Sequence, residues 1–241
     1  MTRYHEPITQ KIALLGGDEF TSDCKAVDAS LIATLKQQHP KIAIVPTAIG
    51  HLKPQIAVNN AISYFAHLGA TAYGVAIHNK SNANNLSLTS ELLHADAIYL
   101  TGGDPLYLLR SIENSLFLST LFDMLSSGRL IIGSSAGAMV LCESMQIPPG
   151  QGDIVPGLNL VPNLRVLPHY ENLSNDFVSG THYKNTESSV RRSTTLLGID
   201  SRTALFIDGN VCNVLGNGCV TVIDDKNQRK YSAGTSLDNL L

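Results

Sequence analysis

A serine that could act as a nucleophile is Ser135, which lies in the pentapeptide Gly-Ser-Ser-Ala-Gly at residues 133–137. The pentapeptide fits the pattern G-x-S-x-G, in which a sharp turn between a strand and a helix exposes the serine hydroxyl. An apolar run over residues 130–132 precedes it, and helix-forming residues follow it. Small residues suit such a turn because its backbone is strained and neighbouring chain passes close by. A plain connection between a strand and a helix would have the same composition, so both interpretations stay open.

A second unusual loop, Thr-Gly-Gly-Asp at residues 101–104, directly follows a predicted strand. Ligands of parallel sheets bind beyond the carboxyl ends of the strands, where this loop and the serine turn are both expected. A glycine pair lets backbone N–H groups approach a ligand, so we expect the N–H groups of Gly103 and Ala136 to form an oxyanion hole. In a purely structural interpretation, Asp104 and the proline after it only begin a helix.

A serine nucleophile needs a base, and His169 is the histidine best placed to be one. It follows a short predicted strand at residues 164–167 and a proline, where a side chain can project over a neighbouring loop. His182 is the rival. The other six histidines precede the serine turn, and several of them lie in or beside helical patterns.

The elements that must position these residues are short apolar strands that alternate with helical patterns. Strands are expected at residues 11–15, 41–46, 72–77, 97–100 and 129–132, and helices at about 23–37, 54–67, 87–94 and 105–126. Continuous apolar strands separated by helices predict a parallel sheet that is covered on both faces. The expected fold is therefore α/β, with a mostly parallel sheet.

The composition changes after about Gln146, where prolines and glycines crowd a loop. Further short strands are expected at residues 164–167, 203–207, 210–215 and 219–223, with turn sequences at 208–210 and 216–218. Such turns between strands predict antiparallel hairpins. We expect one domain over residues 1–241, with a C-terminal β extension over about 196–241.

Composition excludes several classes of protein. The chain has 241 residues, 44% of them hydrophobic, which is enough for a sizeable core. A net charge of −3 and scattered basic residues predict no nucleic-acid partner. No apolar run approaches the roughly 20 residues that span a bilayer, and the N-terminus has no signal-peptide run, so we expect a cytoplasmic protein without membrane contact. The four cysteines show neither C-x-x-C pairing nor metal-ligand spacing, which predicts reduced thiols and no metal.

Four segments together resemble the dipeptidase E (aspartyl dipeptidase) and cyanophycinase family of serine peptidases. They are Gly-Ser-Ser-Ala-Gly-Ala at 133–138, Gly-Gly-Asp at 102–104, Gly-Leu-Asn-Leu-Val-Pro at 157–162 and Pro-His-Tyr at 168–170. Their order and spacing agree over roughly residues 8–224. The resemblance implies a flavodoxin-like fold related to class I glutamine amidotransferases, with serine in place of their cysteine.

The same resemblance implies Ser135 as nucleophile, His169 as general base, and Gly103 and Ala136 as oxyanion-hole donors. It implies hydrolysis of a peptide or isopeptide bond next to aspartate, without metal or cofactor. The expected partner is therefore a small peptide substrate, and a homo-oligomer stays open.

The chain departs from the family at the third member of the triad. The family has a glutamate in a Gly-x-x-Glu segment, and the matching stretch here is Gly-Ile-Asp-Ser-Arg at residues 198–202, with Ser201 at the expected position. The neighbouring Asp200 is the candidate that could orient the imidazole, with Glu143 and Asp153 as weaker substitutes. An unoriented histidine has a poorer tautomer preference and a less stabilised imidazolium.

Relatives carry arginines for the acidic substrate between the histidine and the Gly-x-x-Glu segment. Arg191 and Arg192 are the candidates here, because a guanidinium can hold a carboxylate with two hydrogen bonds. Asp104 is counted with them as a substrate-binding residue. A solvated basic turn would explain the arginine pair equally well.

Two other functions stay open. The missing triad glutamate favours a catalytically weak or inactive member that binds a small acidic ligand or a protein partner. An esterase of the α/β-hydrolase type also uses G-x-S-x-G, but its histidine follows the acid near the C-terminus, and no histidine follows His182 here.

Overall fold

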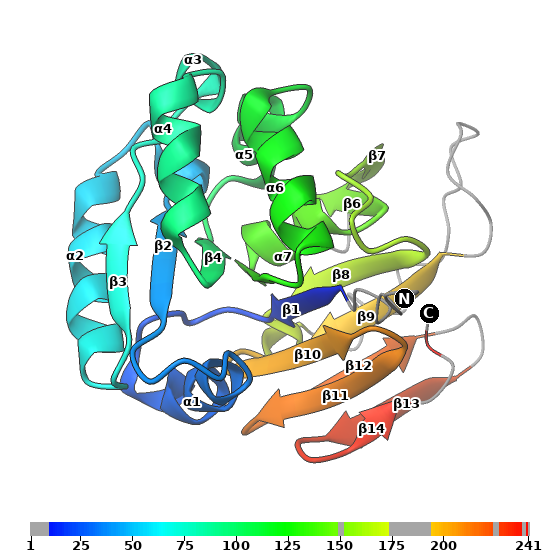
Figure 1. The fold of residues 1–241 in the computed structure, drawn as a ribbon. Coiled ribbons are helices and arrows are strands. Elements are labelled where there is room, and N and C mark those ends of the chain that lie inside the picture. Colours follow the sequence, from blue (N-terminus) through cyan, green and yellow to red (C-terminus); the bar gives the residue numbers. More distant parts are fainter. Residues whose placement is uncertain (1–9, 149–151, 174–193, 224–226, 238–239, 241) are drawn as a thin grey trace, which may run out of the picture.

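The structure, a computed structural model, describes residues 10–148, 152–173, 194–223, 227–237 and 240. Its main sheet has eight strands in the order β14-β11-β10-β1-β5-β4-β2-β3 (Figure 1). Their bounds are β1 Lys11–Leu15, β2 Lys41–Val45, β3 Thr71–Gly74, β4 Ala97–Leu100, β5 Leu130–Ser134, β10 Thr203–Asp208, β11 Val211–Gly216 and β14 Ser236–Leu237. The pairs from β1 through β5, β4 and β2 to β3 are parallel, whereas β10, β11 and β14 add on antiparallel. The expected α/β fold is confirmed.

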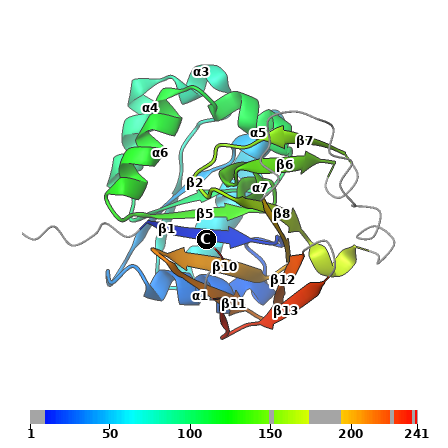
Figure 2. The same cartoon turned by 90° about the vertical axis from the view of Figure 1, so that its right-hand side faces the viewer.

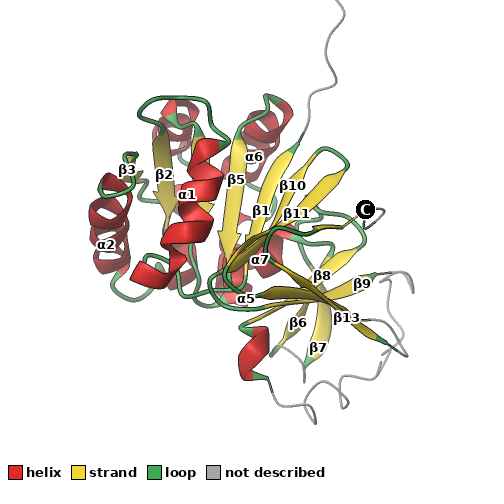
Figure 3. Ribbon diagram, turned by 90° about the horizontal axis from the view of Figure 1, so that it is seen from below, coloured by secondary structure: helices red, strands yellow, loops and turns green. Residues whose placement is uncertain are grey.

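Helices cover both faces of the main sheet (Figures 1 and 3). They are α1 Lys25–Ala33, α2 Pro54–Ala66, α3 Lys80–Ala83, α4 Leu86–Glu91, α5 Pro105–Ile112, α6 Leu116–Ser126 and α7 Ala136–Leu141. Successive strand residues face opposite sides of a sheet. In β1, Ala13 and Leu15 therefore join a core cluster with α1 and α2, and Ile12 and Leu14 join a cluster with α5, α6 and α7.

A second sheet packs beside the main one (Figure 2). It has the order β13-β12-β9-β8, with bounds β8 Leu164–Pro168, β9 Thr195–Ile199, β12 Cys219–Ile223 and β13 Gln228–Ser232. The remaining strands, β6 Ser144–Ile147 and β7 Asp153–Pro156, form a hairpin. Val166, Leu197 and Val220 of the second sheet share one buried cluster with Leu14 of the main sheet. The two sheets thus enclose a common hydrophobic layer.

One of the two predicted hairpin turns is wrong. The turn at residues 208–210 joins the antiparallel pair β10 and β11, as expected. The turn at 216–218 instead leads from β11 in the main sheet to β12 in the second sheet, where β12 pairs with β9 and β13. Gly216 has φ +106°, and a Cβ there would lie 2.3 Å from the carbonyl oxygen of Arg202. The glycine therefore allows the chain to change sheets beside another segment.

Candidate active site

Ser135 lies on a strained turn between β5 and α7. Its φ of +49° and ψ of −107° are rare for a residue with a side chain, and such strain costs of the order of 1–3 kcal/mol. Its N–H donates to the carbonyl oxygen of Leu15, and its own carbonyl oxygen accepts from the N–H of Met139, both at 3.0 Å. A Cβ on Gly133 would lie 2.5 Å from the carbonyl carbon of Gly137. The turn thus has the geometry that its small residues predict.

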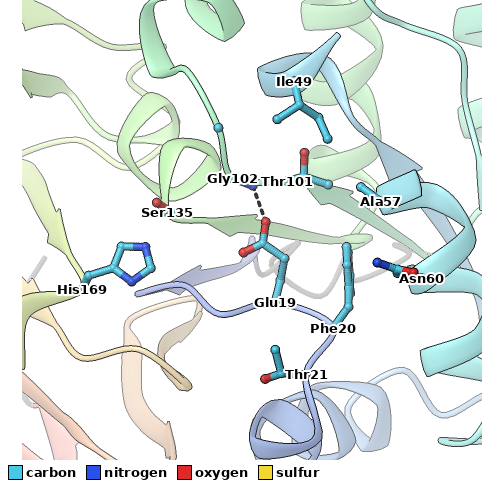
Figure 4. A pocket seen from close by; sticks show the side chains of 11 residues that line it. Glu19, Phe20, Thr21, Ile49, Ala57, Asn60, Thr101, Gly102, Ser135 and His169 are labelled. Atoms are coloured by element: carbon cyan, nitrogen blue, oxygen red, sulfur yellow. Dashed lines mark hydrogen bonds between the residues drawn. The ribbon is translucent and has the colours of Figure 1, made fainter. Parts of the chain in front are cut away.

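The turn opens into a cavity of about 440 Å³ at the carboxyl ends of β1, β4 and β5 (Figure 4). The predicted nucleophile and base both line it, together with the glycine loop after β4. The lining residues are Glu19, Phe20, Thr21, Ile49, Ala57, Asn60, Thr101, Gly102, Gly103, Ser135 and His169. The serine turn, the glycine loop and His169 are far apart in the sequence and line one cavity in the fold.

His169 follows β8 in the left-handed conformation, with φ +52°. Its N–H donates to the carbonyl oxygen of Gly16 at 3.0 Å, which holds the end of β8 against the loop after β1. The imidazole lies directly over Gly17, where a Cβ would be 2.0 Å from the ring carbon Cε1. No hydrogen bond between Ser135 Oγ and the ring is present within the described residues. Catalytic hydrogen bonds are often long in unliganded enzymes and tighten when substrate binds.

Ser201, and not Asp200, contacts the imidazole. His169 Nδ1 lies 2.9 Å from Ser201 Oγ, and the nearest carboxylate oxygen, on Asp18, is 3.9 Å away. The Asp200 carboxylate accepts from the N–H of Cys219 at 2.9 Å, and its buried Oδ1 has no partner within the described residues. Asp200 follows the end of β9 and Ser201 begins the turn to β10, and because the Asp200 carboxylate is held by the N–H of Cys219, it does not make the contact expected of it.

The weaker substitutes also lie elsewhere. Glu143 Oε2 accepts from the N–H of Asn163 and from the hydroxyl of Thr194, each at 3.1 Å. Asp153 is exposed on β7. Neither carboxylate lines the cavity.

Glu171 lies behind Ser201 and accepts from its N–H at 2.8 Å. Burial alone would raise the pKa of Glu171, but hydrogen bonding from the side chain and backbone of Ser201, together with the charge of His169, lowers that pKa below its ordinary value. Arg202 lies within 4 Å of the carboxylates of Asp18, Asp23 and Glu171. A charged carboxylate therefore supports the hydroxyl that holds the ring.

Glu19, which the sequence analysis did not single out, reaches into the cavity from the loop after β1 (Figure 4). Its Oε1 accepts from the N–H of Gly102 at 2.6 Å, and its Oε2 accepts from the hydroxyl of Ser134 at 2.7 Å. The signal that could have found it is the sequence Gly-Gly-Asp-Glu directly after a strand. That sequence repeats the pattern of the Gly-Gly-Asp loop after β4 at the same edge of the sheet.

The predicted oxyanion-hole donors have N–H groups available. Gly103, with φ +139°, packs so closely on the 3-10 helix Thr47–Ile49 that a Cβ would lie 2.6 Å from the carbonyl oxygen of Ala48. Within the described ranges, the N–H of Gly103 donates no hydrogen bond to the protein. Ala136 is the first residue of α7, and the first N–H groups of a helix have no intrahelical acceptor.

The predicted substrate-binding residues are less well placed. Asp104 caps α5, because its side chain accepts from the N–H of Tyr107 at 2.9 Å, and it does not line the cavity. Arg191, Arg192 and the rival base His182 lie outside the described residues. In the part of the chain that the structure covers, no group of three His, Cys, Asp or Glu side chains could hold a metal ion. No helix there could cross a membrane.

Comparisons with known proteins agree on one family. The model of peptidase family S51 matches residues 12–215. Cyanophycinase of Trichormus variabilis is 24% identical over 226 residues, which cover 88% of this chain and 73% of the cyanophycinase. Peptidase E of Nostoc sp. is 26% identical over 178 residues, covering 69% of each chain. A solved peptidase from an acI-B1 Actinobacterium superposes with a TM-score of 0.80 at 23% identity, over 97% of this chain and 98% of that one, and so has the same fold.

Proposed function

The chain belongs to peptidase family S51 and is a serine-type peptidase, and we propose that it hydrolyses a peptide bond of a small peptide through an acyl-enzyme on Ser135. The observation that carries the proposal is the strained Ser135 at the start of α7, facing the same cavity as His169. A serine that costs the fold conformational energy at the mouth of a cavity is well explained by nucleophilic catalysis.

His169 is the general base in this proposal. Its Nδ1 carries the proton and donates a hydrogen bond to Ser201 Oγ. Nε2 is then unprotonated and able to accept a proton. Nε2 takes the proton of Ser135 while Oγ bonds to the scissile carbonyl carbon. The imidazolium then gives this proton to the leaving amine as the C–N bond breaks, and water repeats the sequence on the acyl-enzyme.

The N–H groups of Gly103 and Ala136 stabilise the tetrahedral intermediate. Negative charge on the carbonyl oxygen develops beside the N-terminus of α7, where peptide dipoles favour an anion. Removing one such donor from a known serine protease costs about 3–4 kcal/mol in the transition state. We expect each of the two donors to contribute by a similar amount.

Ser201 and Glu171 replace the family's triad carboxylate. The Ser201 hydroxyl accepts from His169 and donates toward Glu171, so a charge lies one hydroxyl group away from the imidazolium. Asp18, 3.9 Å from Nδ1, adds a second negative charge. Ser201 and Glu171 act by positioning and stabilising the imidazole, and they do not contact the reacting bond.

Peptides with aspartate before the scissile bond are the proposed substrates. The support is the family and the pair Arg191 and Arg192, whose guanidinium groups would pair with the aspartate side chain. Asp104 is the N-cap of α5 and follows the glycine loop directly. We propose that it contributes to substrate binding indirectly, by fixing the position of that loop.

The test combines a fluorophosphonate probe with a library of dipeptides that vary in their first residue. We expect the probe to label the protein and Asp-X dipeptides to be hydrolysed. Ser135→Ala should abolish both, with the circular dichroism spectrum unchanged. Ser134→Ala is the matched control for labelling, because the Ser134 hydroxyl is fully buried against Glu19.

The same experiment separates the competing functions. Turnover of p-nitrophenyl esters without turnover of any dipeptide would indicate an esterase. A folded protein that neither reacts with the probe nor cleaves peptides would indicate a binding protein. Equal peptide hydrolysis by Ser135→Ala would remove Ser135 from the mechanism.

A further inference from the structure

Glu19 places a carboxylate inside the cavity, close to the nucleophile. A Cβ built on Gly102 would lie 2.9 Å from Glu19 Oε1 and 3.3 Å from Ser135 Cβ, so Glu19 and Ser135 flank the same point of the glycine loop. Figure 4 shows the Glu19 carboxylate hydrogen-bonded to Gly102, with Ser135 and His169 to one side of it. The carboxylate is therefore within reach of the first residue of a bound peptide.

The protein supplies Glu19 with hydrogen bonds but with no positive partner. Each oxygen accepts one bond, from the N–H of Gly102 or the hydroxyl of Ser134. A carboxylate can accept about four hydrogen bonds, which leaves acceptor capacity unused. Within the described residues, no lysine or arginine lines the cavity, and no basic nitrogen lies within 4 Å of the Glu19 oxygens.

An unpaired carboxylate at this place opposes the proposed chemistry, because it repels the negative charge that develops on the substrate carbonyl oxygen. A positive charge that arrives with the substrate removes this conflict. The free α-ammonium group of a peptide is two bonds from the carbonyl carbon of its first residue. Glu19 and Ser135 lie close enough together for one residue to place its ammonium group at Glu19 and its carbonyl carbon at Ser135.

We propose that Glu19 binds the α-ammonium group of the substrate and thereby restricts cleavage to the bond after the first residue of a peptide. The inference deepens the proposed peptidase function and rests on it. It makes Glu19 the residue that distinguishes a free N-terminus from a blocked or internal one, whatever the side chain of the first residue.

The turnover test uses aspartyl p-nitroanilides, substituted or not on the aromatic ring, in pairs that differ only in N-acetylation of the aspartate. We expect the wild-type protein to hydrolyse the free amines with a kcat/KM about 100-fold higher than the acetylated compounds. In Glu19→Gln this preference should fall to near one, mainly through a higher KM for the free amines. Glutamine retains an oxygen for the N–H of Gly102, and Asp123→Asn on the exposed side of α6 is the matched loss of charge.

A merely structural role of Glu19 gives a different result. If the carboxylate only ties the loops after β1 and β4 to the serine turn, Glu19→Gln lowers hydrolysis of free and acetylated substrates by the same factor. An unchanged preference in Glu19→Gln overturns the proposal. So does a wild-type protein that hydrolyses both members of a pair equally well.

A binding measurement keeps the two proposals separable. Ser135→Ala protein is titrated with aspartyl-alanine and with N-acetyl-aspartyl-alanine in a calorimeter. We expect at least about tenfold tighter binding of the free amine and no preference in Ser135→Ala/Glu19→Gln. This preference together with an absence of turnover in the wild-type protein would refute the peptidase mechanism and support the role of Glu19. Turnover without the preference would do the reverse.

Discussion

At the scale of single residues, the replacement of a carboxylate by the hydroxyl of Ser201 changes what His169 receives from its neighbour. A hydroxyl can donate as well as accept, so it favours a proton on Nδ1 only when its own proton is directed at another acceptor, here Glu171. It carries no charge to stabilise the imidazolium that forms during attack. Glu171, which accepts from Ser201 N–H at 2.8 Å, supplies that charge from the next position. In the proposed mechanism, this division of roles makes Glu171 a positioning residue, which its sequence position alone does not reveal.

Removing the charge of Glu171 should therefore slow catalysis without removing the base. We expect Glu171→Gln to lower kcat by roughly 10–100-fold, with little change in KM, because the imidazolium is less stabilised while substrate contacts persist. The acidic limb of the profile of kcat/KM against pH should move to lower pH for the same reason. Glu91→Gln on α4 is the control. A purely structural role of Glu171 would lower activity without moving the acidic limb.

Restoring a carboxylate at position 201 is the complementary experiment. In the double variant Glu171→Gln/Ser201→Glu, the new side chain meets Nδ1 directly and the repulsion from Glu171 is removed. We expect kcat to recover at least about tenfold over Glu171→Gln, with the acidic limb shifted back to higher pH. Steady-state rates across pH on one dipeptide decide the matter. No recovery would show that the geometry, and not the charge, limits the rate.

The residues that the sequence predicted and those it missed differ in how local their signals are. Ser135 and His169 belong to short motifs whose backbone geometry is set by neighbours in the chain, and both line the cavity as expected. Asp200 was misplaced because its carboxylate accepts from the N–H of Cys219, a contact with a residue 19 positions further along the chain. Glu19 was missed because its partner Gly102 is 83 residues away. A contact of that kind follows from the order of strands in the sheet.

At the scale of elements, the cavity is made by loops that leave the carboxyl ends of neighbouring strands. The pairing of β1 with β5 and of β5 with β4 brings the Gly-Gly-Asp-Glu loop, the serine turn and the Gly-Gly-Asp loop to one edge. The strand β8 of the second sheet brings His169 to the same edge. Glycine is needed where these loops cross each other, and Gly17 is the clearest case because it lies under the imidazole.

We expect Gly17→Ala to lower kcat/KM by at least about 100-fold, because the new methyl group would occupy the position of the imidazole ring and displace it. The substitution should also cost about 1 kcal/mol of stability, since Gly17 has φ +137°. Gly69→Ala is the matched control: Gly69 has φ +78°, and nothing lies within 4 Å of the added methyl group. It should lose a similar amount of stability and keep full activity. Equal kinetics of the two variants would contradict the placement of the ring.

Several strands with unbroken apolar runs were predicted, whereas the polar strand β13 was not, and neither was β9. The parallel strands β1, β2 and β4 are buried on both faces, so each appears in the sequence as an unbroken apolar run. The strand β13 has an almost fully exposed sequence, Gln-Arg-Lys-Tyr-Ser, and gives no such signal. Its place depends on pairing with β12, which a local pattern does not encode.

At the scale of the whole molecule, the cavity is linked to the core beneath it by aromatic side chains. Phe20, in the cavity wall, contacts the rings of Tyr64, Phe65 and Tyr99 at centroid distances of 5.0–6.0 Å. The hydroxyl of Tyr64 on α2 donates to Asp28 on α1 at 2.7 Å, so the two helices on this face share a buried polar contact. Asp28 is 1% exposed, and its Oδ1 has no partner within the described residues.

Burial raises the pKa of Asp28 to about 7, although the hydrogen bond from Tyr64 opposes the shift. In the unfolded chain an aspartate titrates near pH 3.9. Below about pH 4 the carboxyl is protonated in both states, so Asp28 adds no pH dependence to the free energy of unfolding there. Between about pH 4 and pH 7 the folded state binds more protons than the unfolded state, and stability must fall as the pH rises. Above about pH 7 this contribution becomes constant.

The buried carboxyl should therefore make the whole protein less stable at neutral than at mildly acidic pH. We expect the free energy of unfolding, measured with urea at several pH values, to fall from about pH 5 to about pH 8 by up to a few kcal/mol, at about 1.4 kcal/mol for each unit of pKa difference. Asp28→Asn removes the titrating group and should flatten this part of the curve. The free energy of unfolding of the variant should exceed that of the wild-type protein most near pH 8. Asp123→Asn, an exposed carboxyl lost from α6, should leave the slope intact. Parallel curves for the wild-type protein and Asp28→Asn would show that the carboxyl is ionised in the folded state throughout this range.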